Sequence, residues 1–417
     1  GRSMQGLRQI CLATALVAVG PALANAQEMT AEVIHWWTSG GESAAVKVFA
    51  DTFTEAGGTW IDNAVAGGVN ARTAGINRIV GGDPPTAMQF NTGLQFDEIV
   101  GNGFLRDLED VAEAGKWREV LPDAIVQATN REGKFYAVPV NIHGQNWLWY
   151  NTQVFADAGI EPPTDYSEMI EVGPELEAAG VVPLAFAGEP NWEAFVFDSV
   201  LVTEGGRDLY LEVLGNKNID AVRGDDFRRV AETFAQLRDL VDEGSPGRKW
   251  NDATNMVITG KAAMQVMGDW AKGEFIAAGL TAGEEYGCVI LGGDDAGGYI
   301  MGGDVFVFPE VDDPAQEEAQ VKLAELMLAP ATQIEFNNKK GSVPVRLDVD
   351  VSGMDVCAQK GMAALQDETR QIPSDNFLLT PDLNGALQDV VTQYWNTPSM
   401  EVDTFVENYA SAMEAAS

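Results

Sequence analysis

A short extended segment, a glycine turn and an amphipathic segment follow one another along the first part of the chain. Residues 31–37 (AEVIHWW) have a β-strand composition, a Ser-Gly-Gly-Glu turn follows, and residues 43–55 carry apolar residues at helical spacing. Further strands are predicted at residues 86–90 and 135–140. Alternating strands and helices predict an α/β fold, in which parallel sheets carry helices on both faces and ligands bind at the carboxyl ends of strands.

The second part of the chain is predicted to be mainly helical from Trp147 onward. Strands interrupt it at residues 263–267, 286–290 and 305–308. A chain of 417 residues exceeds what one hydrophobic core usually supports, so two domains are expected.

The first 26 residues have the three parts of a secretory signal. Arg2 and Arg8 precede an apolar run from Ile10 to Val19, and Ala24-Asn25-Ala26 supplies the small-residue cleavage pattern. The apolar run is shorter than the roughly 20 residues that span a bilayer. We therefore expect export to the periplasm, with a mature chain that starts near Gln27.

The formal net charge of −37 restricts the partners. Such a field repels phosphate backbones and anionic lipid, so nucleic acid is not an expected partner and a neutral ligand is favoured. The few histidines and cysteines show no metal-ligand spacing, and no cofactor or metal is expected. Cys288 and Cys357 remain after signal cleavage and can pair in an oxidising compartment, but the sequence does not show their separation.

Six segments in order resemble the family 1 extracellular solute-binding proteins of ABC sugar importers, and the glucose-binding branch in particular. They are VIHWWTSGGE (33–42), GGVNARTAGINRIVGGDPPTAMQF (67–90), YAVPVNIHGQNWLWYN (136–151), GKAAMQVMGDWAKGEF (260–275), GGDVFVF (302–308) and NKKGSVPVR (338–346).

The resemblance implies a two-lobed periplasmic-binding-protein fold with crossing hinge segments and a ligand cleft between the lobes. The implied lobes are residues 27–141 plus 302–344 and residues 142–301 plus 345–417, after the signal peptide at 1–26. The crossings would lie near residues 141–145, 299–303 and 341–346. By resemblance the protein is a monomer that closes on its ligand by a hinge motion and is recognised by membrane permease subunits.

A sugar ring has an apolar face and a fringe of hydroxyls, so its site needs aromatic platforms and polar groups. Trp36 and Trp37 suit the first role in one lobe, and Trp270 suits it in the other. Adjacent residues on a strand point to opposite faces, so the alternative for either member of the pair is core packing.

For the polar fringe, the resemblance places Glu42, Asn91, Asp304 and Lys340 in the cleft. Carboxylates accept hydrogen bonds from vicinal hydroxyls, and a lysine donates with charge assistance. Glu42 could instead stabilise the start of a helix.

Asn141 and His143 lie in the first crossing and are further candidates, although a lone histidine is more often structural. The glucose-binding branch carries a cleft histidine where this chain has Asp375 within Ile372 to Phe377, and Asn91 replaces histidine in some relatives. The departures leave the sugar open.

Three functions are compatible with these residues. The first is non-catalytic capture of a sugar, such as the monosaccharide glucose. The second is capture of another neutral polyhydroxylated solute, such as a polyol, a small oligosaccharide or a sugar derivative. The third is glycoside hydrolysis by Glu42 and Asp304, which would need two carboxyls at about 5 to 9 Å from each other.

Overall fold

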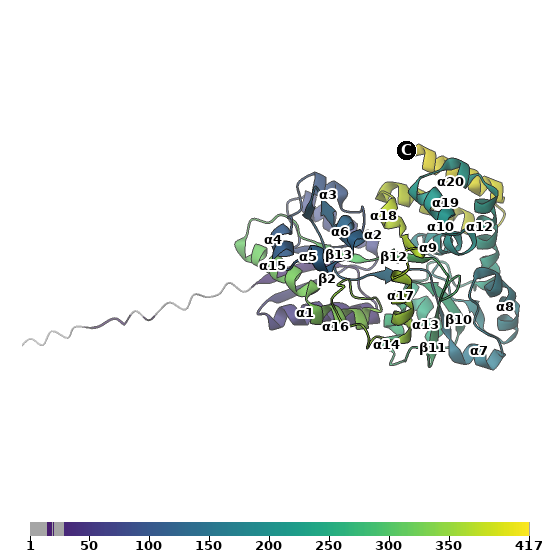
Figure 1. Cartoon of the computed structure of the whole chain (residues 1–417), viewed down its shortest axis with the longest axis horizontal. Coiled ribbons are helices and arrows are strands. Elements are labelled where there is room, and N and C mark those ends of the chain that lie inside the picture. Colours follow the sequence, from purple (N-terminus) through teal and green to yellow (C-terminus); the bar gives the residue numbers. More distant parts are fainter. Residues whose placement is uncertain (1–14, 19, 21–28, 417) are drawn as a thin grey trace, which may run out of the picture.

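The computed structural model describes residues 15–18, 20 and 29–416, which form two lobes side by side (Figure 1). The predicted α/β fold with two lobes is confirmed. Of the predicted signal sequence only residues 15–18 and 20 are described, so the signal stays a prediction. No described helix is both long and apolar enough to cross a membrane.

Lobe one is built on a five-stranded sheet with the order β2-β1-β3-β13-β6. Its strands are β1 (Thr30–His35), β2 (Thr59–Ala64), β3 (Ala87–Asn91), β6 (Val138–Pro139) and β13 (Asp304–Val307). Strand β1 pairs in parallel with β2 and β3. Strand β13 runs antiparallel to β3, and this register places Asp304 directly opposite Asn91.

The sheet is therefore mixed, and the prediction of parallel sheets was wrong for β13, which runs antiparallel to both of its neighbours, β3 and β6. Strand β13 enters the sheet directly after a crossing from the other lobe, so it starts at the edge where β3 ends. A chain that enters from that edge can only run antiparallel to its neighbour.

Helices cover both faces of this sheet and are coloured purple, blue and light green in Figure 1. They are α1 (Gly40–Glu55), α2 (Gly68–Val80), α3 (Asp97–Gly101), α4 (Glu109–Ala114), α5 (Trp117–Val120), α6 (Asp123–Thr129), α15 (Pro314–Leu328) and α16 (Pro330–Lys340), with a small hairpin of β4 (Asn130–Arg131) and β5 (Lys134–Phe135). Helix α1 packs most closely on α16, through apolar side chains such as Phe49 and Phe336, and it also contacts α15.

Lobe two is built on a four-stranded sheet with the order β11-β8-β10-β9. The strands are β8 (Trp147–Asn151), β9 (Val182–Leu184), β10 (Ala262–Met267) and β11 (Tyr286–Ile290). Strand β8 is antiparallel to both of its neighbours, so this sheet is also mixed. The prediction of helix from Trp147 onward missed β8, because the buried run WLWYN has no alternation that would mark a strand.

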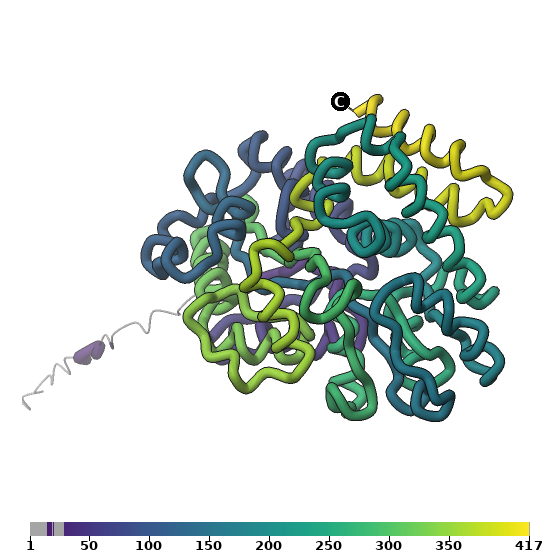
Figure 2. Tube along the Cα trace, turned by 45° about the vertical axis from the view of Figure 1, so that its right-hand side comes forward, coloured from purple at the N-terminus to yellow at the C-terminus, as the bar shows by residue number. Residues whose placement is uncertain are grey.

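The remaining helices surround this sheet. They are α7 (Thr152–Ala158), α8 (Tyr166–Ala178), α9 (Pro190–Val200), α10 (Arg207–Tyr210), α11 (Ile219–Val222), α12 (Asp225–Gln236), α13 (Trp250–Ile258), α14 (Ala271–Ala277), α17 (Val356–Leu365), α18 (Asp375–Leu378), α19 (Pro381–Trp395) and α20 (Val402–Ala415), with π-helical turns η1 (Leu201–Gly205) and η2 (Leu211–Gly215) and a 3₁₀ turn η3 (Leu237–Leu240). The C-terminal helices α19 and α20 return to pack on α9 and α12 (Figure 2).

Segments near the three predicted crossings lie together between the lobes. Strands β14 (Gln371–Pro373), β12 (Tyr299–Gly302) and β7 (His143–Gly144) form a small sheet there. Ile142 and Val343 add backbone hydrogen bonds of 3.0 and 3.1 Å. The exact lobe boundaries given by the sequence stay a prediction.

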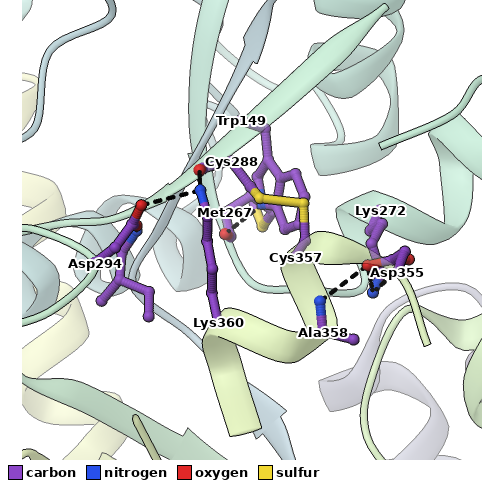
Figure 3. Close-up of a disulfide and its surroundings, with 10 residues drawn as sticks. Trp149, Met267, Lys272, Cys288, Asp294, Asp355, Cys357, Ala358 and Lys360 are labelled. Carbon is purple, nitrogen blue, oxygen red and sulfur yellow. Dashed lines mark hydrogen bonds and ion pairs between the residues drawn. A yellow bond between two sulfur atoms is a disulfide. The ribbon is translucent and has the colours of Figure 1, made fainter. Parts of the chain in front are cut away.

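A disulfide joins Cys288 of β11 to Cys357 of α17, with a Cα–Cα distance of 6.1 Å (Figure 3). Beside it, Lys360 donates a hydrogen bond of 2.6 Å to the Cys288 carbonyl and pairs with Asp294 at 2.9 Å. The pairing that the sequence left open is therefore made, and it anchors α17 to the sheet of lobe two. A cross-link over 69 residues typically stabilises a fold by about 3 to 4 kcal/mol.

Candidate functional site

The residues predicted to contact a ligand come from both lobes and from the first crossing segment. Trp36 and Trp37 follow β1, Glu42 lies in the first turn of α1, Asn91 ends β3, Asn141 and His143 lie at the first crossing, Trp270 precedes α14, Asp304 begins β13, Lys340 ends α16 and Asp375 begins α18.

The two neighbouring tryptophans have opposite environments. Trp37 is 1% exposed and packs against Phe306 and Phe336, with ring centroids 5.5 and 5.4 Å away. Trp36 is half-buried and lies against the guanidinium of Arg72, whose carbon is 5.5 Å from the ring centroid. The structure favours the packing alternative for Trp37, and the role of Trp36 as an aromatic platform stays a prediction.

Glu42 takes a structural position at the start of α1. The Ser39 hydroxyl accepts the Glu42 backbone N–H at 3.2 Å, and the Glu42 carboxylate accepts the Ser39 backbone N–H at 3.3 Å, which makes a capping box. Lys340 Nζ lies 4.0 Å from the Glu42 carboxylate and 5.5 Å from the centre of the Trp37 ring. Burial raises the pKa of Glu42 to about 7, against the opposing effect of Lys340.

A group of five polar residues that we call the histidine cluster lies at the first crossing. Its members are Gln89, Asn141, His143, Asp269 and Asp304, all buried. His143 Nδ1 lies 2.5 Å from Asp269 and Nε2 lies 2.8 Å from Asp304, so one ring bridges a carboxylate of each lobe. Asn141 donates to Asp304 at 3.0 Å, and Gln89 donates to its other oxygen at 2.9 Å.

The electrostatics of the cluster favour a protonated histidine. Burial and the charge of Lys340 act to lower the pKa of His143, but Asp269 and Asp304 outweigh them and raise it. Burial acts to raise the pKa of Asp304, but the hydrogen bond and charge of His143 prevail and lower it to about 2. Only the doubly protonated ring can donate to both carboxylates, so this state is the one that the geometry fits. With both nitrogens engaged, His143 orients Asp304 and has no nitrogen left for a ligand.

Trp270 is the aromatic residue of lobe two at this site. Its half-buried indole meets the His143 ring edge-on, with centroids 4.9 Å apart. Behind it lie Trp192 at 5.9 Å and Phe195 at 5.6 Å, both on α9, and Trp250 is 6.4 Å from Trp192. The sequence reading missed these three, because each lies on a helix where an apolar position normally means core.

A second polar group that we call the arginine cluster lies near Trp36. Its members are Trp36, Arg72, Asn91, Asp198 and Asp375. Arg72 Nη1 lies 3.5 Å from Asn91 Oδ1, which also accepts from Gln95 at 3.0 Å. Asp198 of α9 and Asp375 of α18 form a carboxyl pair, in which burial first and the neighbouring acid second raise the pKa of Asp198, and burial raises that of Asp375.

Direct contacts join the lobes around these groups. Glu274 of α14 accepts hydrogen bonds from the Ser39 hydroxyl at 2.9 Å and the Gly41 amide at 3.1 Å. A Cβ at Gly41 would lie 2.6 Å from the Gly273 carbonyl carbon, so only glycine permits this approach. On the other side, the Leu94 amide donates to the Asn376 carbonyl at 2.9 Å.

These contacts describe lobes that are closed on each other. Two small cavities, one beside Trp192 and one beside Asp198, each hold about 10 Å³, which is room for about one water. Three buried polar atoms near the lobe boundary have no hydrogen-bond partner among the described residues: Thr92 Oγ1, Trp270 Nε1 and Ser374 Oγ. Within the same residues, no group of three or more His, Cys, Asp or Glu side chains could hold a metal ion.

The chain is similar to known proteins over most of its length. A family model described as bacterial extracellular solute-binding protein matches residues 37–334. A protein of Brucella suis biovar 1, named a probable sugar-binding periplasmic protein, is 35% identical over 416 residues, which are 97% of each chain.

Solved structures agree on the fold. A bacterial solute receptor with a preference for β-D-galactopyranose matches with a TM-score of 0.78 and 18% identity, over 93% of this chain and 98% of the other. A chitin oligosaccharide binding protein matches with a TM-score of 0.77 and 19% identity over the same shares. The resemblance found in the sequence is thereby confirmed, and the chain belongs to the family of bacterial extracellular solute-binding proteins.

Proposed function

We propose that this protein is the periplasmic binding component of an ABC importer, which captures a sugar between its lobes and delivers it to the membrane permease. A monosaccharide such as glucose is the first candidate ligand. The names of the relatives support a sugar ligand and a periplasmic location. The six segments in family order support a role in an ABC importer. Capture requires no chemical step, so the proposed receptor is non-catalytic, and the resemblance favours a monomer.

One observation carries the proposal: a continuous chain of contacts links the half-buried tryptophans of the two lobes. The Trp36 amide donates to Gln89 at 3.0 Å, and Gln89 donates to Asp304. Asp304 accepts from His143, which meets the Trp270 ring. Two indoles with buried polar groups between them match a sugar ring, which has apolar faces and a hydroxyl edge.

The buried atoms without partners fit the same ligand. Trp270 Nε1 can only donate, whereas Thr92 Oγ1 can donate and accept. Buried groups of this kind normally have partners, and ligand hydroxyls would supply them. Lys340 adds a charged donor close to both Trp37 and Glu42.

The geometry does not favour the glycoside hydrolase alternative. Gln89, Asn141 and His143 already occupy three of the about four acceptor sites of Asp304. A carboxylate held in this way is a poor nucleophile, while its remaining acceptor site can still take one hydroxyl. Glu42, the other candidate, is engaged in the capping box of α1.

A second candidate function is capture of another neutral polyhydroxylated solute by the same site. The arginine cluster favours it, because Asp375 stands where the glucose-binding branch has a histidine. Polyols, small oligosaccharides and sugar derivatives all present vicinal hydroxyls to such a group.

Thermal unfolding of the purified protein with D-glucose, D-galactose, D-xylose, maltose and sorbitol tests both candidates. A ligand at 100 times its Kd stabilises the folded state by about 2.7 kcal/mol, so the melting temperature rises with the concentration of the true ligand. Glucose is expected to give the largest rise, and a rise with sorbitol alone would support the second candidate. No rise with any of the five would overturn the proposed function.

A further inference from the structure

Arg72 differs from every other arginine in the described part of the chain. Each of the others makes a salt bridge or a hydrogen bond of 3.3 Å or less, as Arg78 does with Glu32 through bonds of 2.6 and 2.7 Å. The only hydrogen bond of Arg72 among the described residues is the 3.5 Å contact with Asn91, and no carboxylate oxygen there lies within 4.0 Å of it. A guanidinium has five N–H donors, so most of its capacity is unused.

This poorly satisfied cation is not simply exposed to water. Arg72 is half-buried, and burial lowers its pKa to about 10, although Asp375 acts in the opposite direction. The chain carries 63 acidic residues, so an ordinary surface arginine would have had many pairing choices. Its unpaired N–H groups are not among the buried polar atoms without a partner, so water can reach them, and an oxygen atom of a ligand could take the place of that water.

The local structure holds the guanidinium in place. Arg72 lies one turn after Gly68 on α2, and a Cβ at Gly68 would lie 2.9 Å from Arg72 Nη1 and 3.4 Å from the Trp36 ring. The missing side chain therefore lets Arg72 lie over the Trp36 ring, where the attraction between cation and ring fixes it further.

Lobe two approaches the same place from the opposite side. Gln95 donates both to Asn91, at 3.0 Å, and to the Asn376 side chain, at 3.2 Å. Asp375, the residue before Asn376, acts on Arg72 through its charge although the two form no ion pair within 4.0 Å. An oxygen atom that lay between the two side chains could accept from the guanidinium and donate to the carboxylate.

We propose that Arg72 is a specificity-determining residue, which together with Asp375 binds one hydroxyl, or a vicinal hydroxyl pair, of a neutral sugar from both lobes. This inference rests on the proposed function and adds to it the ligand group, a sugar hydroxyl, that Arg72 and Asp375 recognise. A sugar acid is disfavoured by the net charge of −37, which repels an anionic ligand. Because the hydroxyl would contact both lobes, its binding would also favour the closed form.

The test compares Arg72→Gln with a matched control, Arg78→Gln, on the same helix. Arg78 is fully paired with Glu32, so its replacement is expected to lower the melting temperature of the ligand-free protein by about 2 to 4 °C and to leave sugar affinity unchanged. Arg72→Gln is expected to leave that temperature unchanged or to raise it, and to weaken the affinity for D-glucose by roughly 10- to 100-fold in calorimetry.

Deoxy sugars identify the hydroxyl. Titration of 2-, 3-, 4- and 6-deoxyglucose is expected to reveal one analogue that binds weakly to the wild-type protein. Because this analogue lacks the hydroxyl that Arg72 binds, its affinity should fall by less than about twofold more in Arg72→Gln, as expected for coupled groups. Equal losses for all analogues, unchanged glucose affinity, or a melting temperature that falls as much as in Arg78→Gln would each overturn the role of Arg72.

Two further outcomes are separable from these. Tighter wild-type binding of D-glucuronate than of D-glucose would overturn the neutral class of ligand. If glucose fails, the same comparison is made with whichever sugar of the thermal panel binds, and a wild-type protein that binds none of them would overturn the proposed function together with this inference.

Discussion

The histidine cluster and the arginine cluster both bring charged groups of the two lobes together, but they differ in how those charges are satisfied. In the histidine cluster a single imidazole bridges Asp269 and Asp304 at 2.5 and 2.8 Å. In the arginine cluster the cation has one contact of 3.5 Å, and the acids opposite it have raised pKa values.

The two clusters therefore have different roles within one site. Charges that the protein itself pairs stabilise the fold and orient a binding group, so their removal should appear as lost stability. Charges that the protein leaves without partners should contribute little to stability and much to binding. Stability and affinity, measured on the same variants, therefore separate the two clusters.

The largest expected effect is the loss of stability in Asp304→Ala. The change leaves the His143 imidazolium buried with one partner removed, which typically costs about 3 to 5 kcal/mol. Asp375→Ala removes a carboxyl whose pKa is raised by burial and is expected to change stability by less than about 1 kcal/mol. Urea unfolding at pH 7, followed by tryptophan fluorescence, measures both.

Equal losses of unfolding free energy in the two variants would contradict the proposed difference between the clusters. Should Asp304→Ala not fold at all, Asp304→Asn keeps the shape and still removes the charge. Its free energy of unfolding is expected to be lower than those of the wild-type protein and of Asp375→Ala, but higher than that of Asp304→Ala.

The adjacent tryptophans provide the next test. Trp37→Ala opens a cavity among Phe306 and Phe336 and is expected to cost about 3 kcal/mol or more. Trp36→Ala removes a half-buried ring and is expected to cost under about 1 kcal/mol in stability, but to weaken sugar binding about 10-fold. Calorimetric unfolding and sugar titration of the two variants give the four values, and a larger loss of stability in Trp36→Ala would contradict the assignment.

The smallest expected effect is a pH dependence. The pKa of His143 is raised in the folded protein. Its contribution to the free energy of unfolding is therefore complete below the unfolded-state pKa of about 6.5, and it is lost as the pH rises through the pKa of the folded state. The stability of the wild-type protein should therefore fall by about 1 to 2 kcal/mol, relative to His143→Gln, as the pH rises through that range.

Two neighbours of His143 bear on this measurement. Asp304, with a pKa of about 2, stays ionised throughout, whereas Glu42, with a pKa of about 7, titrates in the same range. Glu42 contributes equally to both proteins, so the difference between the two urea-unfolding curves isolates His143. Parallel curves for the two proteins from pH 6 to 9 would show that the ring is not protonated in the folded protein.

The fold was largely predictable from the sequence. Helix α1 and the strands β1, β3, β10 and β11 follow from apolar periodicity and glycine turns. Strand β8 was missed because a strand buried on both faces has the apolar run of a buried helix. The antiparallel direction of β13 depends on the edge of the sheet at which the crossing segment ends, and no local sequence pattern predicts that edge.

The site was predictable only in part. The chemistry of a sugar ring pointed to Trp36, Trp37 and Trp270, and the structure places the Trp37 ring in the core. The resemblance pointed to Glu42, Asn91, Asp304 and Lys340. Arg72, however, lies on an amphipathic helix where arginine is an ordinary surface residue. What singles it out is the lack of a partner, a property of the folded neighbourhood and not of the sequence.

The most direct test of the division between the clusters is a crystal structure of the protein with its bound sugar. The quantity to measure is the distance from the nitrogens of Arg72 to the nearest sugar oxygen, beside the same distance for His143. We predict a hydroxyl within about 2.7 to 3.2 Å of Arg72 and none on His143, whose nitrogens remain on Asp269 and Asp304. A guanidinium bound only to protein carboxylates, with His143 turned to the sugar, would contradict the account.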